Sequence, residues 1–155
     1  MTPENTYKLQ SIKKIRLVSL QLMQDLSLEQ LNQVPQGFNN NILWNAAHLI
    51  AAQQGVCYMR AGLPTMISTE FYTAYKPGTM PTTSLVQEEV DDIKSLLLTT
   101  IDQFEADLDN NMFGNYMSWT TRYGVTLSSI DDAIDFLPFH EGMHVGYMMA
   151  LKRLV

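Results

Sequence analysis

Two of the three histidines in the chain, His140 and His144, are spaced as ligands of one metal ion would be. Residues four apart on a helix lie one turn apart on the same face, where two imidazoles can share an ion. The third, His48, lies within a segment that has no charge before Arg60. A single buried histidine is usually a hydrogen-bonded core residue, so for His48 alone that role stays open beside metal binding. For His140 and His144 the spacing favours metal binding.

The same pair belongs to the pattern H-E-x-x-H, in which zinc peptidases use the glutamate as a general base. The residues after His144, 145–155, contain no His, Asp or Glu, so the third ligand that usually follows is absent. We therefore do not expect a peptidase. Glu141 is kept as a candidate catalytic residue that could hydrogen-bond a ligand or metal-bound water. A surface or inter-helix carboxylate is the alternative.

Helical periodicity of apolar residues predicts four helices, which cover about residues 5–31, 41–61, 86–108 and 128–153. On the last of them His140 and His144 continue an inward stripe of Ile, Leu and Met. Without a metal, each buried imidazole would need its own polar partner, and the stripe supplies few. Pro138 predicts a kink just before His140, unless the helix begins near Pro138.

The connections are long in two places. Residues 62–82 contain three prolines and two glycines, which favours a crossover along the molecule over a simple turn. Residues 109–127 are polar and rich in aromatics, which indicates a packed loop. No convincing strand alternation is visible. We expect one domain over residues 1–155, an all-α four-helix bundle with a long crossover between its second and third helices.

Composition excludes several classes of protein. Of the 155 residues, 46% are apolar and 17% are charged, a balance typical of globular domains. The net charge of −6 argues against nucleic acid as a partner. The single cysteine, Cys57, excludes an internal disulfide and suggests a reducing compartment. Without a signal segment or a membrane-spanning apolar run, we expect a soluble, cytoplasmic protein with no membrane partner.

Two segments resemble a known family. Residues 40–48, Asn-Asn-Ile-Leu-Trp-Asn-Ala-Ala-His, with Gly-Leu-Pro at 62–64, resemble the second helix of DinB-like proteins. Residues 139–147, followed by Leu-Lys-Arg at 151–153, resemble their final helix. The resemblance spans the whole chain in length and helix order. It implies a metal held by His48, His140 and His144, and it implies no DNA binding.

Relatives of this kind include S-transferases and an isomerase that use low-molecular-weight thiols such as bacillithiol or mycothiol. The resemblance thus implies a metal-dependent transferase or hydrolase that acts with a small thiol or on a small electrophile, and a homodimer. The alternative is a non-catalytic dimeric metal-binding bundle with a structural or stress-response role. Three imidazoles suit one divalent ion, zinc or nickel before iron or cobalt, and a thiol could be a second cofactor.

Further residues could support such a site. Asn45, one turn before His48, could hold a ligand or serve in capping or packing. The aromatic residues Trp44, Tyr58 and Tyr147 could line a pocket or simply fill the core. Cys57 is nine residues from His48, about 13.5 Å along a helix, which is too far for a fourth ligand.

Overall fold

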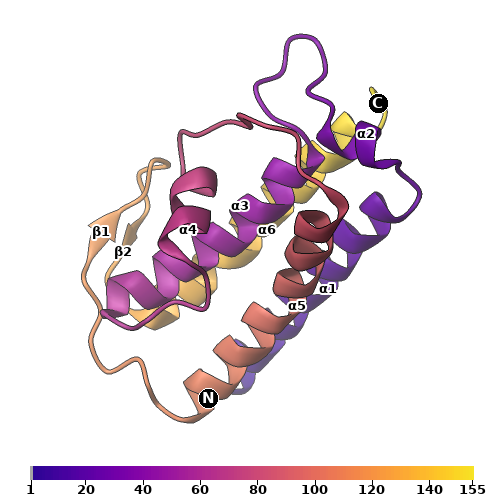
Figure 1. Cartoon of the computed structure of the whole chain (residues 1–155). Helices are drawn as coiled ribbons and strands as arrows, with labels where there is room; N and C mark the ends of the chain where they lie inside the picture. The colour runs from indigo at the N-terminus through magenta and orange to yellow at the C-terminus, as the bar shows by residue number, and fades with distance from the viewer. Residues whose placement is uncertain (1) are drawn as a thin grey trace.

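Four long helices lie side by side in the computed structural model, which describes residues 2–155 (Figure 1). They are α1 (Pro3–Gln24), α3 (Ile42–Gln53), α5 (Gln87–Asp109) and α6 (Ile130–Leu151). The closest neighbours are α1 and α6, and α3 contacts both α5 and α6. The predicted all-α bundle is therefore confirmed.

The central helix is α3, in which every residue is buried. A helix that is apolar on nearly all sides must be covered on all sides, which explains why this segment carries no charge. Its start is capped by Asn41, whose side-chain oxygen accepts a hydrogen bond from the backbone N–H of Trp44 at 2.7 Å. Past Gln53 the chain continues as a π-helical segment, η1 (Gln54–Met59).

The first predicted helix, 5–31, is two helices in the structure. After α1 the chain turns and starts α2 (Leu28–Asn32). The hydroxyl of Ser27 accepts a hydrogen bond from the backbone of Gln30, and the Gln30 side chain accepts one from the backbone of Ser27. This capping box begins a new helix, so the prediction of one uninterrupted helix was wrong at its end.

Both long connections contain small elements that periodicity did not indicate. The crossover holds α4 (Thr69–Tyr75), and the second connection holds an antiparallel hairpin of β1 (Trp119–Thr120) and β2 (Thr126–Leu127). Strands of two residues are too short to show alternation. Figure 1 shows α4 in front of α3, with the hairpin beside it. Of these elements α4 contacts α3, whereas β2 contacts α6.

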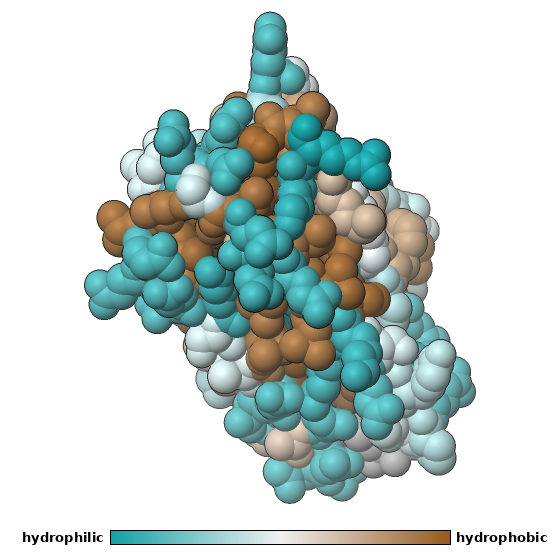
Figure 2. All heavy atoms as spheres, turned by 90° about the vertical axis from the view of Figure 1, so that its right-hand side faces the viewer, coloured by the Kyte–Doolittle hydropathy of each residue, from teal (hydrophilic) through white to brown (hydrophobic). Residues whose placement is uncertain are grey.

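The last helix, α6, runs through Pro138 without a break, so it does not begin there. In the described part of the chain no helix combines the length and the apolarity needed to cross a bilayer. Apolar residues are also exposed, and Figure 2 shows them gathered in a band on the side where Figure 1 places α1 and the C-terminus.

Candidate metal centre

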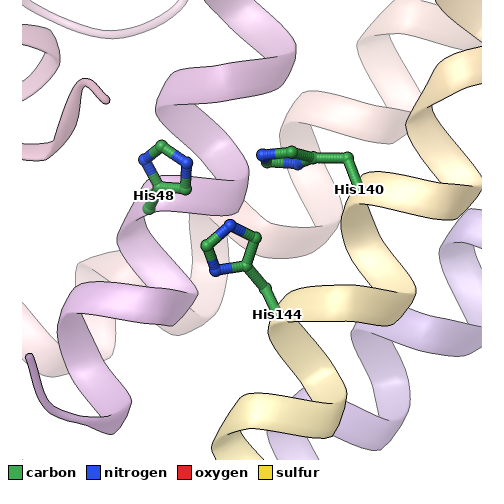
Figure 3. A group of neighbouring side chains, drawn as sticks. All are labelled: His48, His140 and His144. Atoms are coloured by element: carbon green, nitrogen blue, oxygen red, sulfur yellow. The ribbon is translucent and has the colours of Figure 1, made fainter. Parts of the chain in front are cut away.

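The three histidines meet in the space between α3 and α6. His48 comes from α3, whereas His140 and His144 come from successive turns of α6, and all three rings point toward one another (Figure 3). The ring centroids are 4.6 to 5.3 Å apart. One nitrogen of each ring lies within 4.8 Å of the others. The structure thus forms a group that can hold one metal ion.

This spacing fits a divalent ion. Zinc–nitrogen bonds are about 2.1 Å long, so nitrogens that bind the same tetrahedral ion lie roughly 3 to 4 Å apart. Small side-chain movements would bring the three rings to that distance. Among the described residues no Asp, Glu or Cys joins the group. Three protein ligands leave a coordination position for water or substrate, which is typical of catalytic sites.

The orientation of the His48 ring is fixed by a backbone carbonyl. Its Nδ1 lies 2.6 Å from the carbonyl oxygen of Tyr75, at the end of α4. A carbonyl oxygen can only accept a hydrogen bond, so Nδ1 carries the proton and the lone pair is on Nε2. Metal-binding histidines usually donate their second nitrogen to a carbonyl or carboxylate in this way.

The His144 ring is oriented by Asn45. The Nδ1 of His144 lies 2.8 Å from Oδ1 of Asn45. The amide nitrogen of Asn45 donates to the backbone oxygen of Asn41 at 2.8 Å and to Oδ1 of Asn40 at 3.0 Å. These two hydrogen bonds leave the amide oxygen facing His144, so Nδ1 of His144 is also the protonated nitrogen. The sequence indicated that Asn45 could hold a ligand, and in the structure the ligand ring that it contacts is His144.

The third ring, His140, has no hydrogen-bond partner among the described residues, although the residue is only 7% exposed. Its neighbours are the other two imidazoles and the ring of Phe136, whose centroid lies 5.9 Å away. Among the described residues only Oε2 of Glu141 is a buried side-chain oxygen or nitrogen without a partner, so the ring nitrogens of His140 are accessible from the pocket. A metal ion bound in the pocket would give this ring the partner that the described side chains do not supply.

Burial keeps all three imidazoles neutral. It is the main cause that lowers the pKa of His140 to about 2, and repulsion between protonated rings, from His144 and His48, and then repulsion from Arg16 lower it further. Burial and then His48 and Arg122 lower the pKa of His144 to about 3. The pKa of His48 is also lowered, again chiefly by burial. Neutral imidazoles are the form that binds metals.

The histidines line a pocket of about 390 Å³, the size of a small-molecule site. One wall is Trp44, whose ring stacks on His48 at a centroid distance of 4.7 Å and donates its indole N–H to Thr79. The η1 segment contributes Gly55 and Val56 to the lining. A larger hollow of about 970 Å³ shares Trp44 with this pocket but contains no histidine.

Comparison with known families adds one finding. The DinB superfamily matches residues 12–148, which is most of the chain. The chain belongs to the DinB superfamily. The resemblance drawn from the two helices is therefore confirmed. Proteins with curated functions yielded no match.

Other candidates lie outside the pocket of this DinB-superfamily chain. The phenol of Tyr58 donates to Asp107 at 2.6 Å within the core, and Tyr147 packs against Phe38. Cys57 is fully buried, and burial raises the pKa of its thiol, so it is not a reactive thiolate. Of the aromatic residues considered, only Trp44 lines the pocket with the histidines.

Glu141 takes the role of an inter-helix carboxylate. Its Oε1 accepts hydrogen bonds from Nε and Nη2 of Arg16, at 3.0 and 2.7 Å, and both side chains are almost completely buried. Glu141 does not line the pocket. The structure therefore brings the three histidines together and joins this carboxylate to α1 instead.

Several residues at this DinB-like site were missed by sequence reasoning. The carbonyl of Tyr75 comes from the crossover, and Trp119 and Arg122 come from the second connection. A backbone carbonyl has no sequence signature, and loop residues carry no periodicity. The one available signal was the length of both connections, since long loops often border functional sites.

Proposed function

We propose that this protein binds one divalent metal ion, zinc or nickel, through His48, His140 and His144 and acts as a metal-dependent transferase or hydrolase on small molecules. The observation that carries this proposal is a buried group of neutral, oriented imidazoles that faces a pocket rather than a closed core. A structural ion would be enclosed by protein ligands, whereas three ligands leave room for a reactant.

Residues of the chain prepare the site. The Tyr75 carbonyl and the Asn45 amide hold two ligand rings with their Nε2 lone pairs free. Trp44 covers one face of His48, and Phe136 borders His140. These apolar rings keep water away from the ligand atoms and strengthen the electrostatic effects there. When bound, the ion supplies a Lewis acid that lowers the pKa of a thiol or of water.

Of these two nucleophiles we favour a low-molecular-weight thiol, because the superfamily resemblance points to S-transfer. The described residues of the pocket include no cysteine or serine that could serve as a nucleophile. We therefore propose that the nucleophile enters with the reactants. A hydrolytic role would use water in the same position.

The test has two stages. The first is the metal content of protein purified without a metal-affinity column, in the wild type and in His140→Gln. We expect about one ion per chain in the wild type and loss of the ion in the variant. The second is conjugation of glutathione, bacillithiol or mycothiol to chlorodinitrobenzene, before and after chelation and metal return. Bound metal without turnover in thiol or ester assays would instead indicate the non-catalytic role.

A further inference from the structure

The pocket that holds the histidines is positively charged. Among its described lining residues, the charged side chains are Arg60 and Arg122, and no Asp or Glu is present. The whole chain has 16 acidic and 10 basic residues. A pocket without carboxylates in an acidic protein is therefore not a reflection of average composition.

Neither guanidinium is neutralised by an acidic side chain of the described chain. The Cζ of Arg60 lies 4.5 Å from the centroid of the Trp119 ring, and that of Arg122 lies 5.9 Å from the Tyr123 ring. Stacking on an aromatic face positions a guanidinium without cancelling its charge. Both groups keep N–H donors that can bind a carboxylate.

Arg60 and Arg122 line the same pocket as the three histidines. The two arginines enter from different elements, one after η1 and one between the strands of the hairpin. Two separate segments of the chain therefore each supply one guanidinium to the pocket lining.

We propose that this pocket selects a small carboxylate-bearing ligand, whose acid groups bind Arg60 and Arg122 while the rest of the molecule extends toward the histidines. The proposal names the substrate class of the proposed function and rests on it. Three neutral imidazoles do not offset the charge of a divalent ion, so ion and guanidiniums together favour an anion. Carboxylates pair with guanidinium through charge-assisted hydrogen bonds, which supply selectivity over a neutral analogue.

The chain provides its own reporter, because its two tryptophans, Trp44 and Trp119, both line this pocket. Tryptophan fluorescence can be titrated with mercaptosuccinate, a dicarboxylate thiol, and with 1-thioglycerol, a neutral thiol of similar size. We expect mercaptosuccinate to bind roughly tenfold or more tightly than thioglycerol, in the metal-free and the metal-loaded protein. In the metal-free protein the preference should disappear in Arg60→Gln/Arg122→Gln, with thioglycerol binding unchanged. In the metal-loaded protein it should only decrease, because the ion still favours an anion.

The matched control is Lys14→Gln/Lys94→Gln, which changes the net charge equally but outside the pocket lining. It should retain the preference for mercaptosuccinate. In the metal-free protein, equal binding of the two thiols by the wild type, or a preference that survives loss of both arginines, would overturn the proposal and leave the metal-dependent function standing. Failure to bind metal would instead remove the proposed function, while titration of the metal-free protein still decides anion selectivity.

Discussion

Two hydrogen bonds outside the histidine group decide which ring nitrogens face the metal position. One acceptor is the Tyr75 carbonyl and the other is the amide oxygen of Asn45. Only the second can be removed by substitution, and Asn45 is 1% exposed. Because Asn45 is buried, replacing it tests its hydrogen bond to His144 without changing the exposed surface.

We expect Asn45→Leu to weaken zinc binding by about 10- to 100-fold, because His144 loses the acceptor that fixes its tautomer and ring orientation. Competition with a chromophoric chelator measures the affinity. The control is Asn32→Leu, which removes hydrogen bonds to the backbone of Leu28 and Leu85 outside the pocket. Both variants should unfold more easily, but only Asn45→Leu should bind zinc less tightly. Equal weakening in both would contradict a positioning role.

The lowered histidine pKa values predict an unusual pH dependence. Burial lowers the pKa of His144 to about 3 and that of His140 to about 2, so neither ring gains a proton as the pH falls from 7.5 to 5.5. These two rings should therefore cost no zinc affinity over this range, and His48, whose pKa burial lowers below its usual 6.5, should cost less than about tenfold. Three exposed histidines with a pKa near 6.5 would lose about tenfold each at pH 5.5, or roughly a thousandfold together. Calorimetric titration with zinc at both pH values distinguishes the buried site from three exposed histidines. A thousandfold loss of zinc affinity would contradict the buried, neutral site.

At the scale of elements, α1 is joined to α6 through the buried guanidinium of Arg16. Its N–H groups donate to Glu141, to the hydroxyl of Thr100 and to the carbonyls of Leu97 and Leu49. The other carboxylate oxygen of Glu141, Oε2, has no partner among the described residues. The buried charge of Glu141 is therefore compensated almost entirely by Arg16.

Removing one member of the Arg16–Glu141 pair should destabilise the protein far more than removing both. We expect Arg16→Met to lower the free energy of unfolding by about 3–5 kcal/mol, since it leaves Glu141 buried without a counter-charge. Arg16→Met combined with Glu141→Leu should recover most of that loss, because two apolar side chains then fill the space. Urea unfolding of the metal-free protein measures all three. A double variant as unstable as the single one would show that the pair contributes by more than mutual compensation.

The long helices could be predicted from sequence because their apolar residues repeat at helical spacing over many turns. That periodicity also placed His140 and His144 on the inward face of α6, and the absence of charge placed His48 in the centre. Periodicity did not separate α2 from α1, because a capping box at Ser27 acts locally and leaves the apolar pattern intact.

The pocket could not be predicted in the same way. Its ring-orienting carbonyl at Tyr75 and its arginine at position 122 lie in connections whose path depends on how they pack over α3 and α6. Asn45 was identifiable as a neighbour of the site, since one helical turn separates it from His48. The sequence could not show which ring Asn45 would hold. His144 is distant in sequence, and only the packing of α3 on α6 brings Asn45 and His144 together.

At the scale of the whole molecule, the outward side of α6 is only partly covered. Tyr123 contacts Phe139, yet Phe139 and Met149 are about half exposed, and the space around Gly142 and Gly146 is open. The sequence between Asp135 and Lys152 carries no exposed charge, since Glu141 is buried. Large exposed apolar faces bordered by polar residues are typical of interaction sites.

We propose a second copy of the chain as the partner of this face. The first turns of α6 carry Asp131 and Asp135, which also contact Asn5 and Lys8 of α1, and Lys152 and Arg153 follow its last residue. In a two-fold dimer with antiparallel α6 helices, the acidic end of one copy lies beside the basic end of the other, and the apolar residues between them are covered. The homodimer that the superfamily resemblance implied is thus expected to form through α6.

We expect the wild type to sediment as a dimer and Gly146→Glu to sediment as a monomer, because the new carboxylates would face an apolar surface of the other copy. The control is Gly114→Glu, which makes the same substitution at an exposed glycine with open space around it, in the connection before the hairpin. It should remain dimeric. Because Gly146 lies outside the pocket lining, the monomeric variant should still bind zinc. A monomeric wild type, or a dimer that tolerates Gly146→Glu, would place any interface elsewhere than on α6.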